Sequence, residues 1–135
     1  MKLLPILFYT ILITSCNPGQ EKKPAGAMDT GRDFIRATLD GNFKPAEALL
    51  FNDPQNVQLF DSYKKYYERL PAEKKLAYKN ASYNINTYTD KNDSVSIINY
   101  SNSYMKEPMN IKLVKKENVW TVDFKYTYGD STENQ

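Results

Sequence analysis

The chain has 135 residues, a net charge of +2, eleven tyrosines, one cysteine and no histidine. A nucleic-acid-binding protein would carry a basic stripe, so this nearly balanced charge predicts no nucleic-acid partner. The lack of histidine removes the commonest catalytic base and metal ligand. With 41% hydrophobic residues, the composition predicts a packed core, and the length predicts one domain.

The first sixteen residues have the pattern of a cleaved leader. Lys2 precedes a mostly apolar run, Leu3 to Ile13, which has about the length of a secretory signal and is too short for a spanning helix of ~20 residues. The sequence ITSC at 13–16 resembles the lipobox of bacterial lipoproteins, in which an aliphatic residue and small residues precede the modified cysteine. The resemblance implies that residues 1–15 form a signal peptide, that Cys16 receives diacylglycerol on its sulfur, and that the new amino group is acylated, with palmitate as the expected acyl group.

A lipid anchor explains Cys16 better than the other roles of a lone cysteine. A catalytic cysteine usually needs a base such as histidine, which the chain lacks. A disulfide needs a second cysteine, and a buried thiol would not be placed at the polar edge of a signal sequence. We therefore expect a protein of the cell envelope, held through Cys16 on a bacterial membrane. The outer membrane is the preferred one, and the domain would face the periplasm or the cell surface.

Composition divides the rest of the chain into three parts. Residues 16–27 hold proline, glycine and charge without apolar periodicity, which is typical of a flexible tether. Residues 28–129 carry the periodic patterns of a domain, and residues 130–135 form a polar tail. Removal of residues 1–15 takes away Lys2 and no acidic residue, which lowers the net charge to +1.

Two helices are predicted at the start of the domain. Thr30 and Asp33 have the spacing of a capping box, and Gly41 supplies the stop of the first helix. A short second helix follows, with Pro45 in its first turn. The apolar side of the first helix consists of Phe34, Ile35, Thr38 and Leu39, and that of the second consists of Ala46, Leu49 and Leu50.

The third helix has the clearest pattern. Asp53 supplies an N-cap and Pro54 the first helical residue. Pro71 ends or kinks the helix, and another turn or two is expected after it. The predicted apolar arc consists of Leu59, Phe60, Tyr63, Tyr66, Tyr67 and Leu70, and Val57 alone breaks the pattern.

After Asn80 the apolar period changes from helical to two, which predicts strands. We expect turns at residues 90–93 and around Glu117 and Asn118, and a bulge near Ile97, where the alternation slips. The last strand alternates most strongly, and this predicts a largely buried Trp120 and a solvent-facing Asp123. The residues expected on its inner face are Trp120, Val122, Phe124, Tyr126 and Tyr128.

Helices followed by an antiparallel meander predict an α+β fold, with N-terminal helices packed on one face of a bent four-stranded antiparallel sheet. The segments GRDFIRATLDGNFKPAEALL (31–50) and LVKKENVWTVDF (113–124) resemble the first helices and the last hairpin of nuclear-transport-factor-2-like (cystatin-like) domains. With the lipobox they resemble a group of small bacterial lipoproteins of that fold. The resemblance implies a cone whose mouth, between the sheet and the long helix, holds a small ligand.

Aromatic residues are the candidates for lining such a pocket. The predicted ligand-binding residues are Tyr63 and Tyr67 on the third helix, Tyr100 on the second strand, and Phe124 and Tyr126 on the last strand. The alternative, which the sequence alone favours, is that these rings fill a small core and keep their hydroxyls in contact with water.

Enzymatic chemistry has little support in the sequence. An isomerase-like or dehydratase-like enzyme of this fold would need a core-facing carboxylate, whereas Asp61, Glu68 and Asp123 fall outside the predicted apolar faces. We expect no catalytic residue, no cofactor and no metal site. The predicted function is a membrane-anchored, non-enzymatic ligand-binding or protein-interaction module. The alternatives are a small-molecule enzyme that uses the cone pocket and an inhibitor or immunity-type protein that binds its partner through the sheet surface.

Overall fold

The computed structural model describes residues 26–128, so the predicted signal peptide, Cys16, the tether up to residue 25 and the polar tail lie outside the described residues. The described chain begins with four helices, continues with four strands and ends with a short helix. The helices are α1 (Ala27–Asp40), α2 (Phe43–Ala48), α3 (Pro54–Glu68), α4 (Ala72–Lys79) and α5 (Lys125–Tyr128). The strands are β1 (Tyr83–Asn92), β2 (Val95–Asn102), β3 (Met109–Lys116) and β4 (Val119–Asp123).

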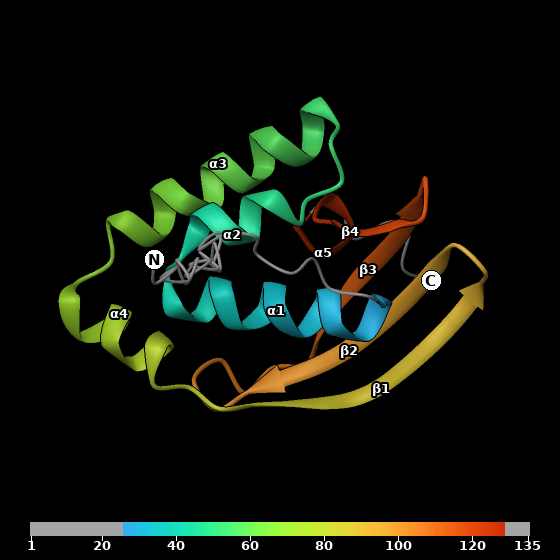
Figure 1. The fold of residues 1–135 in the computed structure, drawn as a ribbon. Coiled ribbons are helices and arrows are strands. Elements are labelled where there is room, and N and C mark those ends of the chain that lie inside the picture. The colour runs from blue at the N-terminus through green and yellow to red at the C-terminus, as the bar shows by residue number, and fades with distance from the viewer. Residues whose placement is uncertain (1–25, 129–135) are drawn as a thin grey trace, which may run out of the picture.

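The four strands form one antiparallel sheet in the order β1-β2-β3-β4. Figure 1 shows the sheet bending around α1, with the helices on its concave side. α1 contacts β2, β3 and β4 as well as α2 and α4, and α3 contacts α5. The predicted fold class is confirmed, because the helices pack on one face of a bent four-stranded antiparallel sheet.

The first helix begins earlier than the sequence predicted. Gly26 is the N-cap, and Ala27 is buried in the first turn. Thr30 lies inside the helix, where its hydroxyl donates to the carbonyl of Gly26 at 2.9 Å, so the predicted capping box is wrong. Packing of Ala27 against the core extends the helix by a turn and moves the start of the domain into the predicted tether. Gly41 ends the helix as predicted, at a φ of 69°.

α3 begins as predicted. The Asp53 carboxylate accepts from the backbone N–H groups of Gln55 and Asn56 at 2.9 and 3.0 Å, and Pro54 is the first helical residue. Phe60 and Tyr67 are buried and Val57 is exposed, as the pattern indicated. Tyr66 is the error in the predicted apolar arc, because it is 55% exposed on the side of the last turn that faces solvent.

The irregular strand is β1 and not β2. β2 alternates without a slip, with Ser96, Ile98, Tyr100 and Asn102 all buried. The register shifts lie in β1, between Ile85 and Thr87 and between Asp90 and Asn92. The predicted bulge in β2 is therefore wrong: Ser96 takes a core position that the sequence pattern assigned to its apolar neighbours. Its hydroxyl donates to Asp90 Oδ1 at 2.6 Å, which satisfies a buried polar group that the pattern did not count.

The last strand is shorter than predicted. β4 ends at Asp123, and residues 125–128 form α5 in place of a continued strand. The Asn56 side chain favours termination of the strand at Asp123, because its Oδ1 accepts a hydrogen bond from the backbone N–H of Lys125 at 2.8 Å. The predicted tight turn between β3 and β4 is confirmed, with Glu117 and Asn118 both at positive φ.

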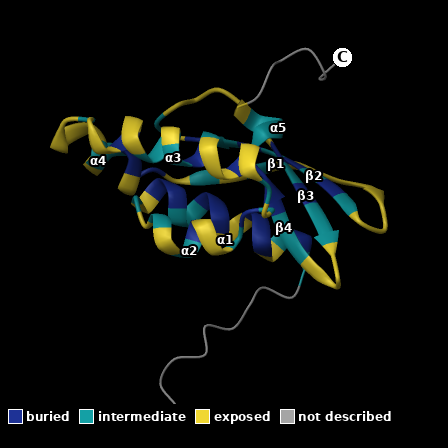
Figure 2. Cartoon of the chain, turned by 90° about the horizontal axis from the view of Figure 1, so that it is seen from above, coloured by how far each residue is buried: buried dark blue, intermediate teal, exposed yellow. Residues whose placement is uncertain are grey.

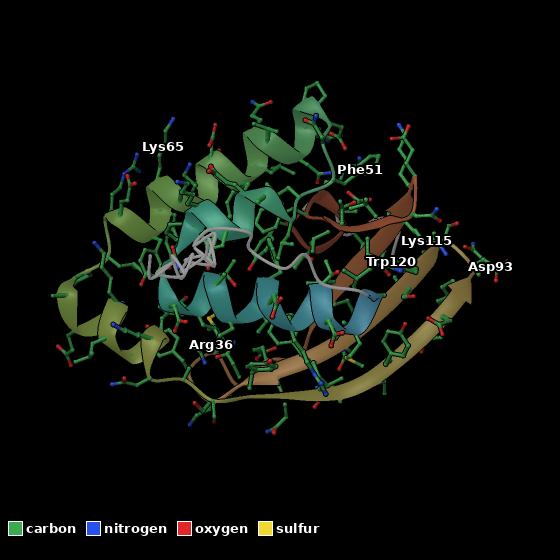
Figure 3. The ribbon with its side chains drawn as sticks, in the orientation of Figure 1. Arg36, Phe51, Lys65, Asp93, Lys115 and Trp120 are labelled. Carbon is green, nitrogen blue, oxygen red and sulfur yellow. The ribbon has the colours of Figure 1, made fainter. Side chains whose placement is uncertain are left out.

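Trp120 is partly buried and packs against the core, in line with the prediction, although some of its surface stays exposed. It pairs with Lys115 across the β3–β4 hairpin, close to the turn, where the hairpin extends past the helices (Figure 1). The Lys115 ammonium lies 5.4 Å from the centre of the indole ring, and Figure 3 shows the two side chains side by side. The exposure that remains follows from the position of Trp120 near the turn, which the alternation does not reveal.

The core lies between the helices and the concave face of the sheet (Figure 2). Every buried hydrophobic residue of its main cluster lies between Ala27 and Phe124. This segment therefore holds the core formed by the described residues, and we expect a chain that contains it to fold on its own. Among residues 26–128, each helix is too short or too polar to span a bilayer.

Candidate functional site

A small cavity lies at the centre of the fold, between the helices and the inner face of β2 and β3. Its volume is about 30 Å³, which is room for roughly one water molecule. Its walls are mainly aromatic and aliphatic, with tyrosine hydroxyls, one amide and two threonines as the polar groups. The lining residues are Phe34, Thr38, Leu39, Tyr63, Tyr78, Tyr100, Asn102, Met105, Met109, Ile111, Phe124, Thr127 and Tyr128.

Tyr63 and Tyr100 both line this cavity, and their hydroxyls make no hydrogen bond to another described residue; neither oxygen is fully buried, since Asp123 Oδ1 is the fully buried side-chain oxygen without a partner among residues 26–128. Tyr100 is 6% exposed, and Tyr63 packs its ring against Phe124 with 5.8 Å between the ring centres. Burial raises the pKa of both phenols well above the ordinary value of 10.0, and the nearby hydroxyl of Tyr128 adds to the effect. Both groups are therefore neutral at physiological pH, and each can donate and accept a hydrogen bond.

Two methionines stand at the rim of the cavity, each next to a tyrosine. The Tyr78 hydroxyl donates to Met105 Sδ at 3.4 Å, and the Tyr128 hydroxyl donates to Met109 Sδ at 4.0 Å. Met105 and Tyr128 are 43% and 45% exposed, so they form the part of the lining that reaches solvent. Methionine is flexible and its sulfur is a weak acceptor, which makes this side of the wall easy to rearrange.

The structure brings together three of the five predicted ligand-binding residues. Tyr63, Tyr100 and Phe124 line the same cavity. Tyr67 is buried, but it packs on Phe43, with 5.0 Å between the ring centres, and does not line the cavity.

The placement of Tyr126 on the inner face is wrong. α5 turns the chain after Phe124, and the Tyr126 ring lies 5.7 Å from the Lys112 ammonium, a side chain of the opposite sheet face. Tyr128 lines the cavity in its place, from a helix and not from a strand. Tyr78, which is not among the predicted site residues, also lines the cavity. The sequence signal for it was the helical spacing that continues after Pro71.

Asp123 is buried, so the prediction that it faces solvent is wrong. It does point to the outer face of the sheet, but two lysines cover it there. Its carboxylate lies 3.7 Å from Lys112 Nζ, across the β3–β4 pair, and 3.6 Å from Lys125 Nζ. Its Oδ1 atom has no hydrogen-bond partner in the described part of the chain. The two ammonium groups compensate the buried charge, which assigns Asp123 a structural role.

The alternative functions would each be favoured by one feature, a carboxylate in the cavity or an apolar outer face of the sheet. An enzyme of the predicted kind needs a carboxylate in the cavity, and the residues that line it include none. A partner protein bound through the sheet would fit an apolar outer face. That face carries a polar row of Asn86, Asn99 and Asn110, joined by hydrogen bonds of 2.9 and 2.7 Å, next to the half-buried Val95, Ile97 and Val114. Within residues 26–128, no three potential ligand side chains gather to hold a metal ion.

The comparisons with known proteins do not add a family to this geometry. No family model, no curated protein sequence and no solved structure matches the chain.

Proposed function

We propose that this chain is a lipid-anchored, non-enzymatic binding module of the bacterial cell envelope, and that the tyrosine-lined cavity is its binding site. The observation that carries the second part is that the partly buried Tyr63 and the buried Tyr100 both line the cavity, and neither hydroxyl makes a hydrogen bond to another described residue. A hydrogen bond between neutral groups contributes about 0.5–1.5 kcal/mol net. A bound molecule that offers a donor or an acceptor to these hydroxyls would gain that energy.

The chemistry of the walls selects the class of ligand. The residues that line the cavity include no lysine, arginine, aspartate or glutamate, so a charged ligand would lose its hydration without gaining an opposite charge. A neutral molecule with an apolar body and one hydroxyl or amide group fits both the rings and the phenols. Because the cavity holds only about one water molecule, such a ligand enters by displacing Met105 and the Tyr128 ring at the rim.

The ligand prediction is tested with matched pairs of small molecules. Neutral aromatic or aliphatic alcohols and amides are expected to raise the melting temperature by mass action, whereas carboxylate and ammonium analogues of the same shape are not. Tyr63→Phe and Tyr100→Phe should each weaken binding of the best neutral compound by about tenfold, the equivalent of one lost hydrogen bond. Tyr66→Phe, at an exposed position on the same helix, is the matched control and should bind normally. Equal affinity in all three variants would show that the hydroxyls only pack.

The anchor is tested separately. Cys16→Ser is expected to release the protein from the membrane fraction or to leave its signal uncleaved, because the acyl chains attach through that sulfur and stable anchoring needs more than one chain. Fractionation and the mass of the mature chain measure the two outcomes. Unchanged membrane association with normal processing would overturn the lipid anchor and would leave the ligand prediction untouched.

A further inference from the structure

The end of the molecule formed by the last turn of α3 and by α4 has an excess of positive charge. Residues 65–79 hold five basic and two acidic side chains, an excess of three, whereas the whole chain has a net charge of +2. The positive charge is therefore concentrated in this short segment. The term basic end is used below for one surface. It is formed by Lys65, Arg69, Lys74, Lys75 and Lys79 together with Tyr66 and Leu76.

Most cations of the basic end are available to an external partner. Lys65, Arg69, Lys74 and Lys79 are exposed, and none of them belongs to the ion pairs formed among residues 26–128. Figure 3 shows Lys65 projecting from α3 away from the sheet. Lys75 alone is engaged, since its ammonium donates to the carbonyl of Glu68 at 2.8 Å.

Two large apolar side chains accompany these charges. Leu76 is 57% exposed and Tyr66 is 55% exposed, the highest values among the large hydrophobic residues of the described chain. Figures 1 and 2 show α4 at one extremity of the molecule, with most of its surface exposed. A leucine and a tyrosine among lysines at a projecting end have the composition of an interfacial membrane contact. There the ring and the leucine enter the headgroup region, and the lysine stems keep their ammonium groups at the phosphates.

The opposite end of the molecule lacks this charge. The tips of the β1–β2 and β3–β4 hairpins carry Lys91, Lys115 and Lys116 together with Asp90, Asp93 and Glu117, so their charges balance. Val119 there is 42% exposed. The two ends thus each present an exposed aliphatic residue, and they differ in net charge.

We propose that the basic end docks on a bilayer that contains anionic phospholipids, with Leu76 and Tyr66 in the headgroup region. Charge complementarity selects the surface, since each lysine or arginine near an anionic membrane strengthens binding. This contact does not require the lipid on Cys16. Where both act, the anchor holds the chain near the membrane and the basic end fixes which side of the domain faces it.

The test uses a chain of residues 17–135, which keeps the whole core and lacks the leader and the cysteine. Sedimentation with vesicles of phosphatidylglycerol and phosphatidylcholine measures binding, and pure phosphatidylcholine vesicles are the reference. We expect binding to the anionic vesicles only, and a loss of binding at high salt because the charges are screened. The double variant Lys74→Glu/Lys79→Glu should weaken binding at least tenfold, and Leu76→Ser severalfold.

Matched variants at the other end separate a local contact from total charge. Lys91→Glu/Lys116→Glu changes the net charge by the same amount, and Val119→Ser removes an aliphatic side chain of similar exposure. Both should bind like the unmodified chain, and thermal unfolding of every variant confirms that it is folded. Equal losses in the two double variants, equal binding to neutral vesicles, or no binding to anionic vesicles would each overturn the proposal.

Discussion

Replacement of Phe60 with alanine is expected to lower the free energy of unfolding by about 3–5 kcal/mol, as for other fully buried large aromatic residues. Phe60 is 1% exposed. Its ring lies 5.1 Å from the ring of Phe124, at the end of the sheet, and 6.0 Å from those of Phe34 and Phe43 on α1 and α2. The residue therefore joins three helices to the sheet, and the cavity left by alanine would lie where no single element can move to fill it.

Urea unfolding measures this change, with Tyr66→Ala as the control on the same helix. Tyr66 is 55% exposed, so its replacement should alter the free energy of unfolding by no more than about 0.5 kcal/mol. A loss below about 1 kcal/mol in Phe60→Ala would show that α3 does not pack on the sheet through this residue.

Asn56→Ala is expected to cost about 2–4 kcal/mol. Asn56 has no exposed surface, and its amide serves two backbone groups far apart in sequence. Its Oδ1 accepts from the N–H of Lys125 at 2.8 Å, and its Nδ2 donates to the carbonyl of Phe51 at 3.2 Å. Alanine would leave the N–H of Lys125 without its acceptor, at about 1–3 kcal/mol. It would also remove the bond to the Phe51 carbonyl, worth about 0.5–1.5 kcal/mol, although that carbonyl still accepts from the N–H of Asp53 at 2.9 Å. The better helix propensity of alanine offsets only part of the loss.

Hydrogen exchange distinguishes this mechanism from a general loss of stability. In Asn56→Ala the amide of Lys125 should exchange faster, relative to the amides of β2 and β3, than in the unmodified chain, because its acceptor is gone. Gln55→Ala, at the preceding exposed position, should leave both stability and exchange unchanged. Normal protection of Lys125 in the Asn56 variant would show that another acceptor ends β4.

Local signals predicted the helices and most turns of this chain. Asp53 and Pro54 start α3, Gly41 ends α1, and Glu117 with Asn118 makes the β3–β4 turn, as expected. Each of these features depends on the backbone preferences of one residue or on a hydrogen bond to a near neighbour in sequence. A few adjacent residues are therefore enough to predict it. The apolar alternation likewise placed Tyr100 and Phe124 on the inner face.

Predictions from local sequence patterns were wrong where a partner distant in sequence decides whether a residue is buried or which backbone conformation it adopts. Ser96 has a polar side chain, yet it is buried because Asp90 on the neighbouring strand accepts its hydrogen bond. Tyr126 continues the strand pattern, yet the chain turns into α5 before it, where Asn56 of another helix binds the backbone of Lys125. The sequence pattern contains the polarity and spacing of residues. It does not show which distant residue forms a hydrogen bond with a buried polar group.

The amino-acid sequence by itself determined the fold class, the caps of the main helix and the apolar faces that meet in the core, because these follow from short-range sterics and from periodic burial. Only the tertiary structure decided the site. It places the hydroxyls of Tyr63 and Tyr100, from a helix and a strand, in one cavity of about 30 Å³. It also covers Asp123 with Lys112 and Lys125. The physical reason is that strand register and helix packing bring together residues far apart in sequence, and the burial of a charge or a hydroxyl depends on the groups that arrive beside it.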